Sequence, residues 1–429
     1  MKGYRLPEDL LLGAASSAAQ TEGGDVRHNW NKWSRTNRIA DGTDIRRGND
    51  GWKNWKADID IMAVMGLETY RFSVEWARIQ PKAREIDLEA VNHYREMITY
   101  MRTRGIRPLL TLQHFTLPEW FEAQGGFTRP ANVRHFLKYV GIAVNYFGDL
   151  VSDYCTFNEP NLYAVLAYGG GGFPPGENNP VTVRRVLSVM AGCHIRAYQK
   201  IHRMRERMGY TDTKVGTGLH MRAFAPLDPL SVVQAKKADI TRYLFQTAAA
   251  KAFLNGEFSP AIENLGGFKK GCYCDYAGVV YFTRDHVKLQ GGTTTRADDP
   301  KSDTGLEIYP QGLEDVSREL WEICGKPVWI LANGVCDRDD SFRCLWLYDQ
   351  LAVLARARIP VKRYYYWSFA DSFEWLDGES ARCGLVGVDY ETKRRTVKQS
   401  GHFYREMIRC RGVSADMAAR YVRGRQYHT

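Results

Sequence analysis

Two segments of the chain place carboxylates beside groups that can hold a sugar. Asn158 and Glu159 follow directly on a short apolar run, and Glu374 lies in an aromatic segment that begins at Trp367 and ends at Trp375. Amides and carboxylates exchange hydrogen bonds with hydroxyl groups, and flat indole faces cover the C–H surface of a ring. A carboxyl group can also donate or accept the proton that a glycosidic oxygen exchanges during cleavage.

Other polar residues stand in comparable positions elsewhere in the chain. Gln20 follows the first apolar run, Arg71 lies within the second, and His114 follows the third. Each residue alone has a structural explanation, such as a core histidine or an arginine that binds strand-end carbonyls. One shared binding site explains residues at five strand ends better than five separate structural roles.

The elements that must position these residues are eight short β-branched or apolar runs separated by segments of helical period. This pattern is typical of repeated βα units and predicts a single closed (β/α)₈ barrel, in which the carboxyl ends of the strands form the active site. No Pro-, Ser- or Gly-rich linker interrupts the series. The predicted strands are residues 10–16, 69–76, 107–113, 153–158, 214–220, 277–283, 328–332 and 363–369.

The end of the chain differs from the repeated units. Residues 409–429 carry five arginines and no strand pattern, so we divide the chain into a barrel over 1–408 and a basic C-terminal tail over 409–429. The tail is expected to be either a terminal helix or a disordered end. Its charge alone favours a solvated surface.

Composition narrows the classes of function. Hydrophobic residues make up 44% of the 429 residues and charged residues 25%, as in ordinary globular proteins. The net charge of +10 is spread along the chain and gives little support to a nucleic-acid partner. No run is long enough for a membrane helix, and the nine cysteines lack zinc-ligand spacing, so we expect reduced thiols in a cytoplasmic protein.

Five segments together resemble glycoside hydrolase family 1, the retaining β-glucosidases and β-galactosidases. They are residues 13–23, 70–79, 111–118, 156–160 and 367–375, in the family's order. The resemblance implies that Glu159 is the general acid/base and that Asn158 contacts the sugar 2-hydroxyl. It implies a small-molecule glycoside as substrate and Trp367 as the stacking platform. It assigns the remaining hydroxyl contacts to Gln20, His114, Glu374 and Trp375. The sequence holds no phosphate loop, metal-ligand cluster or dinucleotide fingerprint, so we expect no cofactor or metal.

The sequence departs from the family where the second carboxylate should be. A retaining enzyme needs a nucleophile about 5–5.5 Å from the acid/base, and the family supplies it in an Ile-Thr-Glu-Asn-Gly motif. Here the segment reads Ile330-Leu331-Ala332-Asn333-Gly334, so Ala332 occupies the nucleophile position. The family's supporting tyrosine falls on Phe282, and an amide position falls on Val280. Arg71 should therefore find another anionic partner, such as a charged group of the substrate.

Several explanations of Ala332 stay open from the sequence alone. The alanine was introduced into an ordinary retaining enzyme, or it is natural, and the loss of polar groups at Val280 and Phe282 favours natural loss. A natural enzyme would use Glu159 in inversion, in substrate assistance, or in elimination or rearrangement of a sugar-derived metabolite. Cys336 is a conceivable thiol nucleophile, although a structural cysteine is the simpler reading. A non-catalytic sugar-binding protein is the alternative from another class.

Overall fold

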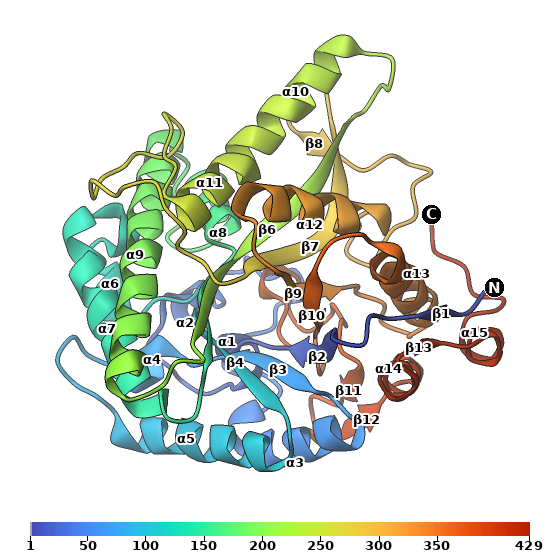
Figure 1. The fold of residues 1–429 in the computed structure, drawn as a ribbon, viewed down its shortest axis with the longest axis horizontal. Helices are drawn as coiled ribbons and strands as arrows, with labels where there is room; N and C mark the ends of the chain where they lie inside the picture. Colours follow the sequence, from blue (N-terminus) through green and yellow to red (C-terminus); the bar gives the residue numbers. More distant parts are fainter. Residues whose placement is uncertain (1) are drawn as a thin grey trace.

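Eight parallel strands close into a barrel in the computed structural model, which describes residues 2–429 (Figure 1). Each strand pairs with the next, and the last barrel strand pairs with the first, Tyr364 opposite Leu12. The single (β/α)₈ barrel expected from the sequence is confirmed. The barrel strands in order are β2 (Leu11–Ala15), β3 (Thr69–Ser73), β4 (Arg107–Gln113), β5 (Asp153–Asn158), β6 (Lys214–Pro226), β7 (Ala277–Val287), β9 (Val328–Gly334) and β10 (Val361–Trp367).

Helices form the outer layer because each buries one face against the strands. In the helix at Leu88–Thr103, Asp87 caps the first turn by accepting the Ala90 N–H at 2.9 Å, and Val91, Tyr94, Ile98 and Met101 form the buried face. Among residues 2–429 no helix has the length and apolar character needed to cross a bilayer. The longer helices are α3 (Gly51–Val64), α5 (Leu88–Thr103), α7 (Val133–Phe147), α8 (Pro160–Tyr168), α9 (Pro180–Arg207), α10 (Val232–Arg242), α11 (Ala248–Asn255), α12 (Gln311–Cys324), α13 (Arg343–Arg356) and α14 (Gln399–Cys410).

Two barrel strands continue past the ends that the sequence predicts. β6 runs to Pro226 and β7 to Val287, and their extensions pair from Ala223 opposite Arg284 to Pro226 opposite Val287. The short strand β8 (Thr293–Thr294) pairs antiparallel with the end of β7. Together with α10 the extensions form an arm that rises from the barrel mouth (Figure 1). The arm therefore adds polar strand residues to one side of the site.

Short elements complete the connections between strands and helices. They are β1 (Tyr4–Arg5), α1 (Ala18–Thr21), α2 (Asn29–Trp33), α4 (Trp76–Ile79), α6 (Glu119–Glu122), η1 (Gly126–Thr128), η2 (Pro130–Asn132), the π-helical turn η3 (Tyr243–Thr247), η4 (Trp375–Asp377), β11 (Val386–Val388), β12 (Arg395–Val397), β13 (Gly412–Val413) and α15 (Ala415–Tyr421). Most of them lie in the connections that follow barrel strands.

The basic segment 409–429 is ordered against the barrel. β13 pairs antiparallel with β1, and α15 follows with Met417 and Tyr421 buried. Arg411 donates hydrogen bonds to the carbonyl oxygens of Pro7 and Glu8 at 2.9 Å. Of the two states left open by the sequence, the helix is the one present. The division at 408/409 stays a prediction, and α14 runs across it to Cys410.

One pair of cysteines corrects the expectation of reduced thiols. Cys336 follows β9, Cys383 follows β10, and the two form a disulfide with their Cα atoms 4.2 Å apart. The pair is 47 residues apart in sequence, so only the adjacency of the two strand-end loops brings the thiols together. The other seven cysteines are free thiols. The cytoplasmic location stays a prediction.

Candidate active site

A cavity of about 280 Å³ opens at the carboxyl ends of the barrel strands. Eight of the ten residues singled out in the sequence line it, namely His114, Asn158, Glu159, Phe282, Ala332, Trp367, Glu374 and Trp375. Gln20 and Arg71 are fully buried behind this lining and contact it through hydrogen bonds. The fold thus brings the predicted site residues together in one place.

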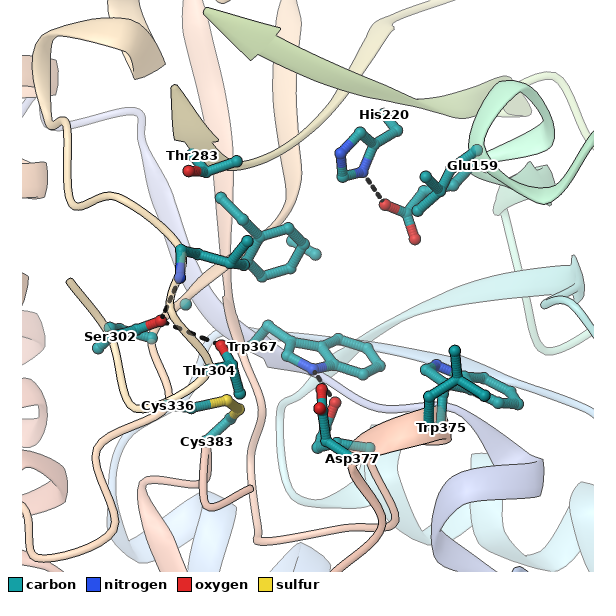
Figure 2. Close-up of a pocket in the computed structure, with 18 of the residues that line it drawn as sticks. Glu159, His220, Thr283, Ser302, Thr304, Cys336, Trp367, Trp375, Asp377 and Cys383 are labelled. Atoms are coloured by element: carbon teal, nitrogen blue, oxygen red, sulfur yellow. Dashed lines mark hydrogen bonds and ion pairs between the residues drawn. A yellow bond between two sulfur atoms is a disulfide. The ribbon is translucent and has the colours of Figure 1, made fainter. Parts of the chain in front are cut away.

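Glu159 is held by the turn between β5 and α8. Its backbone adopts a left-handed conformation with φ of 50°, and its N–H donates to the carbonyl oxygen of Gly218 at 2.7 Å. Pro160 then begins α8 at a position where no N–H is needed. One carboxylate oxygen, Oε2, accepts the Asn158 amide at 2.8 Å, and Oε1 contacts His220 (Figure 2).

A buried hydrogen-bond chain fixes the side chains beneath the cavity floor. Arg71 donates to Asn158 Oδ1, to the Leu331 carbonyl at 3.0 Å and to Thr111 Oγ1 at 3.1 Å. All three acceptors are neutral, so Arg71 has no carboxylate partner within residues 2–429. An anionic partner supplied by the substrate stays a prediction.

The same hydrogen-bond chain determines the protonation state of His114. Asn158 presents its oxygen to Arg71, so its amide nitrogen faces His114 Nε2 at 3.1 Å. Burial, reinforced by the charge of Arg71, places the pKa of His114 well below its usual value. The neutral ring therefore accepts at Nε2 and carries its proton on Nδ1, which has no partner among the described residues. This buried N–H is therefore an unpaired donor beside the cavity.

Glu374 is held by neutral donors on the opposite side of the cavity. Oε2 accepts from Trp367 Nε1 at 3.2 Å and Gln20 Nε2 at 3.3 Å, and Oε1 accepts from Ser372 at 2.8 Å. Burial raises the pKa of Glu374 to about 7 because no cation compensates its charge. The rings of Trp367 and His114 stack with centroids 5.6 Å apart. An indole and a carboxyl group thus flank the same part of the cavity.

The wall at the nucleophile position is apolar. Ala332 pairs in register with Val280, and both pack in one cluster with Phe282 and the Cys336–Cys383 disulfide. Cys336 is therefore not a free thiol. Two carboxylates that lie close to Ala332 and Arg71 in the sequence have structural roles outside the cavity lining. Asp337 accepts the N–H groups of 342 and 343, and Glu75 caps α4.

The sequence analysis missed three residues of the site. Arg222 Nε donates to His220 Nε2 at 2.8 Å, and Arg222 Nη1 pairs with Asp285 at 2.7 Å. His220 in turn contacts Glu159 through Nδ1. A signal was present, because His220 ends the predicted strand 214–220 as His114 follows the third. Arg222 and Asp285 lie on the strand extensions, which the sequence pattern did not predict.

A second titratable cluster lies on the arm. His286, Asp299 and Glu307 bring potential ligand atoms within 4.8 Å of one another, as a metal site would require. However, Arg284 binds both oxygens of Glu307, at 3.1 Å through Nε and 2.5 Å through Nη2. The cluster is therefore an ion-pair network. The expectation that the protein needs no metal stays a prediction.

Glu75 should make stability depend on pH. Burial raises its pKa to about 7, so the folded state holds a proton that the unfolded state releases near its ordinary value of 4.5. This contribution to stability is full at low pH and is lost as the pH rises through about 7. We expect the Tm of the wild-type protein, relative to Glu75→Gln, to fall between pH 5 and 8. A difference in Tm that is constant across this range would contradict the raised pKa.

Comparison with known proteins matches nearly the whole chain to glycosidases. The model of Glycosyl hydrolase family 1 matches residues 3–270 and 278–413. A β-galactosidase of Pyrococcus woesei is 29% identical, over 97% of this chain and 100% of its own. A β-glycosidase from Pyrococcus horikoshii superposes with a TM-score of 0.87 at 29% identity, over 98% of both chains. The β-glucosidase from Thermotoga maritima in complex with glucoimidazole superposes with a TM-score of 0.88 at 25% identity, over 95% of this chain and 100% of that one.

The barrel and the site at its mouth define a glycoside hydrolase. The family match covers far more than half of the chain, and the chain belongs to glycosyl hydrolase family 1. The resemblance read from the five sequence segments is thereby confirmed at the level of the family.

Proposed function

We propose that the cavity binds the glycosyl unit of a β-linked glycoside and that Glu159 exchanges the proton of the glycosidic oxygen, while no side chain acts as nucleophile. The observation that carries the proposal is the wall around Ala332. Phe282 and the disulfide complete that wall, and the lining carboxylates Glu159, Glu374 and Asp377 belong to other strand ends. A methyl group cannot attack the anomeric carbon.

The sugar-binding part of the proposal rests on the intact polar groups. Trp367 supplies a flat face and Glu374 a carboxyl group within one cavity, and His114 lines the same cavity. Asn158 is committed to Arg71, Glu159 and His114, so its position is fixed before any ligand arrives. Gln20 is fully buried and supports Glu374, and its contact with a sugar hydroxyl stays a prediction.

The reaction must take its nucleophile from outside the protein. Water or a group of the substrate itself would attack the anomeric carbon on the side that Ala332 leaves open, which corresponds to an inverting or substrate-assisted reaction. The loss of polarity at Val280 and Phe282 supports a natural origin of this arrangement. If a carboxylate stood at position 332, polar side chains would be expected at positions 280 and 282 to donate hydrogen bonds to it.

Calorimetry tests the binding part directly. We expect a simple hexose or β-hexoside to bind, and Trp367→Ala to weaken binding by about 10-fold or more because the stacking surface is lost. Deoxy analogues should also bind worse, since they leave buried polar groups unpaired. Trp321→Ala on α12, outside the cavity, is the matched control. If no sugar binds, or if deoxy sugars bind equally well, the proposal is wrong.

A further inference from the structure

Three free cysteines lie together at the foot of the barrel, at the amino ends of β7 and β9. Cys272 and Cys274 precede β7, and Cys324 is the last residue of α12, which precedes β9. The two strands are neighbours in the barrel, with Ala277 opposite Val328. The cluster therefore lies at the end of the barrel opposite the sugar cavity, and its chemistry is independent of the proposed function.

The end of α11 holds both segments of the cluster in place. The backbone N–H of Tyr273 donates to the carbonyl oxygen of Leu254 at 2.8 Å. The side-chain amide of Asn255 donates to the carbonyl oxygen of Ile323 at 2.6 Å. Residues adjacent to all three cysteines are thus anchored to the same helix end, so the fold itself brings the thiols together.

Cys274 is the middle member of the cluster. Its thiol makes hydrogen-bond contacts with the thiols of both Cys272 and Cys324. The Sγ atom of Cys272 also lies 3.2 Å from the carbonyl oxygen of Cys274. Cys274 is fully buried, Cys324 is half-buried and Cys272 is exposed. The three thiols therefore form a path from solvent to the core.

The three thiols differ in how readily they ionise. A hydrogen bond from the Cys274 thiol, aided by the charge of Lys326, lowers the pKa of Cys272 to about 5. The contact with Cys274 also lowers the pKa of Cys324. The same two contacts, together with burial, raise the pKa of Cys274 well above its ordinary value. Cys272 is thus an exposed thiolate at neutral pH, the form of cysteine that acts as a nucleophile.

We propose that these three cysteines are a reversible oxidation site that reacts with low-molecular-weight disulfides and carries the oxidation from Cys272 to a buried bond between Cys274 and Cys324. Cys272 is suited to both ends of this relay. An ionised thiol attacks a disulfide readily, and a thiol of low pKa is also the better leaving group when a neighbouring thiol attacks in turn.

The relay consists of three thiol–disulfide exchanges. The Cys272 thiolate attacks one sulfur of the small disulfide, and the other half leaves as a thiolate. Cys274 then attacks the Cys272 sulfur, so that the second half leaves. Finally Cys324 attacks the Cys274 sulfur, and Cys272 leaves as a thiolate. The protein loses two electrons, the small disulfide is reduced to two thiols, and these take up the protons that Cys274 and Cys324 lose.

Alkylation tests the first step, and the chain supplies its own control. Cys272 and Cys410 are the two exposed free cysteines of residues 2–429. In the folded protein at pH 6, iodoacetamide should modify Cys272 about 10-fold faster than Cys410, because the larger ionised fraction outweighs the lower intrinsic reactivity of a low-pKa thiolate. Peptide mapping by mass spectrometry measures both rates in one sample. Equal rates would overturn the proposal.

Oxidation by hydroxyethyl disulfide, a small neutral reagent, tests the relay in the full-length protein. Mass spectrometry of the digested protein distinguishes any new bond from Cys336–Cys383. We expect a Cys274–Cys324 bond with Cys272 free, and recovery of the thiols on reduction with dithiothreitol. The proposal is wrong if no new bond forms, or if oxidation ends on Cys272 as a mixed disulfide or as a bond to Cys274.

Variants separate the steps. Cys274→Ala should stop at a mixed disulfide on Cys272, and Cys324→Ser should stop at the Cys272–Cys274 bond. Cys272→Ser should slow formation of the Cys274–Cys324 bond by about 10-fold or more, because the entry thiolate is lost. Cys410→Ser, which removes the other exposed thiol, should oxidise as the wild-type protein does.

The exposed position of Cys272 makes Cys272→Ser the deciding variant, since it leaves the buried packing around Cys274 unchanged. If the Cys274–Cys324 bond forms in Cys272→Ser as fast as in the wild-type protein, oxidation does not enter at Cys272 and the proposal is overturned.

Discussion

Glu159→Gln is expected to lower turnover of the best β-glycoside by about 10²- to 10⁴-fold, the usual contribution of a positioned general acid or base. Glutamine keeps the size of the side chain and can still contact Asn158 and His220, but it cannot exchange a proton. Affinity for the sugar should change little, because Trp367, His114 and Glu374 remain in place. Turnover is followed with aryl and alkyl β-glycosides, and affinity by calorimetry.

The control for this variant is Glu322→Gln, which removes an exposed carboxylate on α12 away from the cavity. It should match the wild-type protein in both measurements. Equal turnover in wild-type protein and Glu159→Gln would exclude Glu159 as the proton-transfer group. If neither protein turns over any glycoside while both bind sugar, the chain is a sugar-binding protein that has lost its reaction.

We expect the second large effect on activity from substitutions at and beside Ala332, the nucleophile position. Ala332→Glu alone should give little retaining hydrolysis, because the new carboxylate enters a wall formed by Val280 and Phe282, which raises its pKa. Adding Phe282→Tyr supplies a hydroxyl donor at the position where the family has a tyrosine. A hydrogen bond to a charged group contributes about 1.5–3 kcal/mol, so the double variant should hydrolyse about 10- to 100-fold faster than the single one.

Arg71 makes this restoration feasible, since its guanidinium lies under the wall without a carboxylate partner. Hydrolysis of an aryl β-glycoside is measured in wild-type protein and in the variants, with Phe282→Tyr alone as the control. Mass spectrometry then detects the glycosyl–protein adduct that only a new nucleophile can form. Full activity from Ala332→Glu alone would mean that the alanine was introduced into an ordinary retaining enzyme.

The sequence predicted the barrel well because strand signals are local. Residues 107–113 and 153–158 coincide with β4 and β5, where apolar runs stop at polar strand ends. The other predicted strands overlap their observed counterparts. The extensions of β6 and β7 were not predicted, because beyond the barrel rim they carry charged residues such as Arg222 and Asp285 that pair with each other across the strands.

The sequence predicted individual residues of the site but not the hydrogen bonds that connect them. A motif can indicate that Asn158 and Glu159 stand together, whereas the orientation of His220 depends on Arg222, which comes from a strand extension. The Cys336–Cys383 bond likewise depends on how two loops meet above the barrel. Arg71 illustrates the same limit, since its acceptors come from three other strands, β4, β5 and β9.

The pairing of β10 with β2 has a consequence for biosynthesis. Tyr364 and Leu12 lie opposite each other although more than 300 residues separate them, so one edge of β2 stays open until β10 has left the ribosome. Trp367 and Glu374, on β10 and just beyond it, arrive at the same late stage. Nascent chains that end before Val361 should therefore expose an unpaired strand edge and bind no sugar. Until then, the barrel itself leaves that edge unprotected.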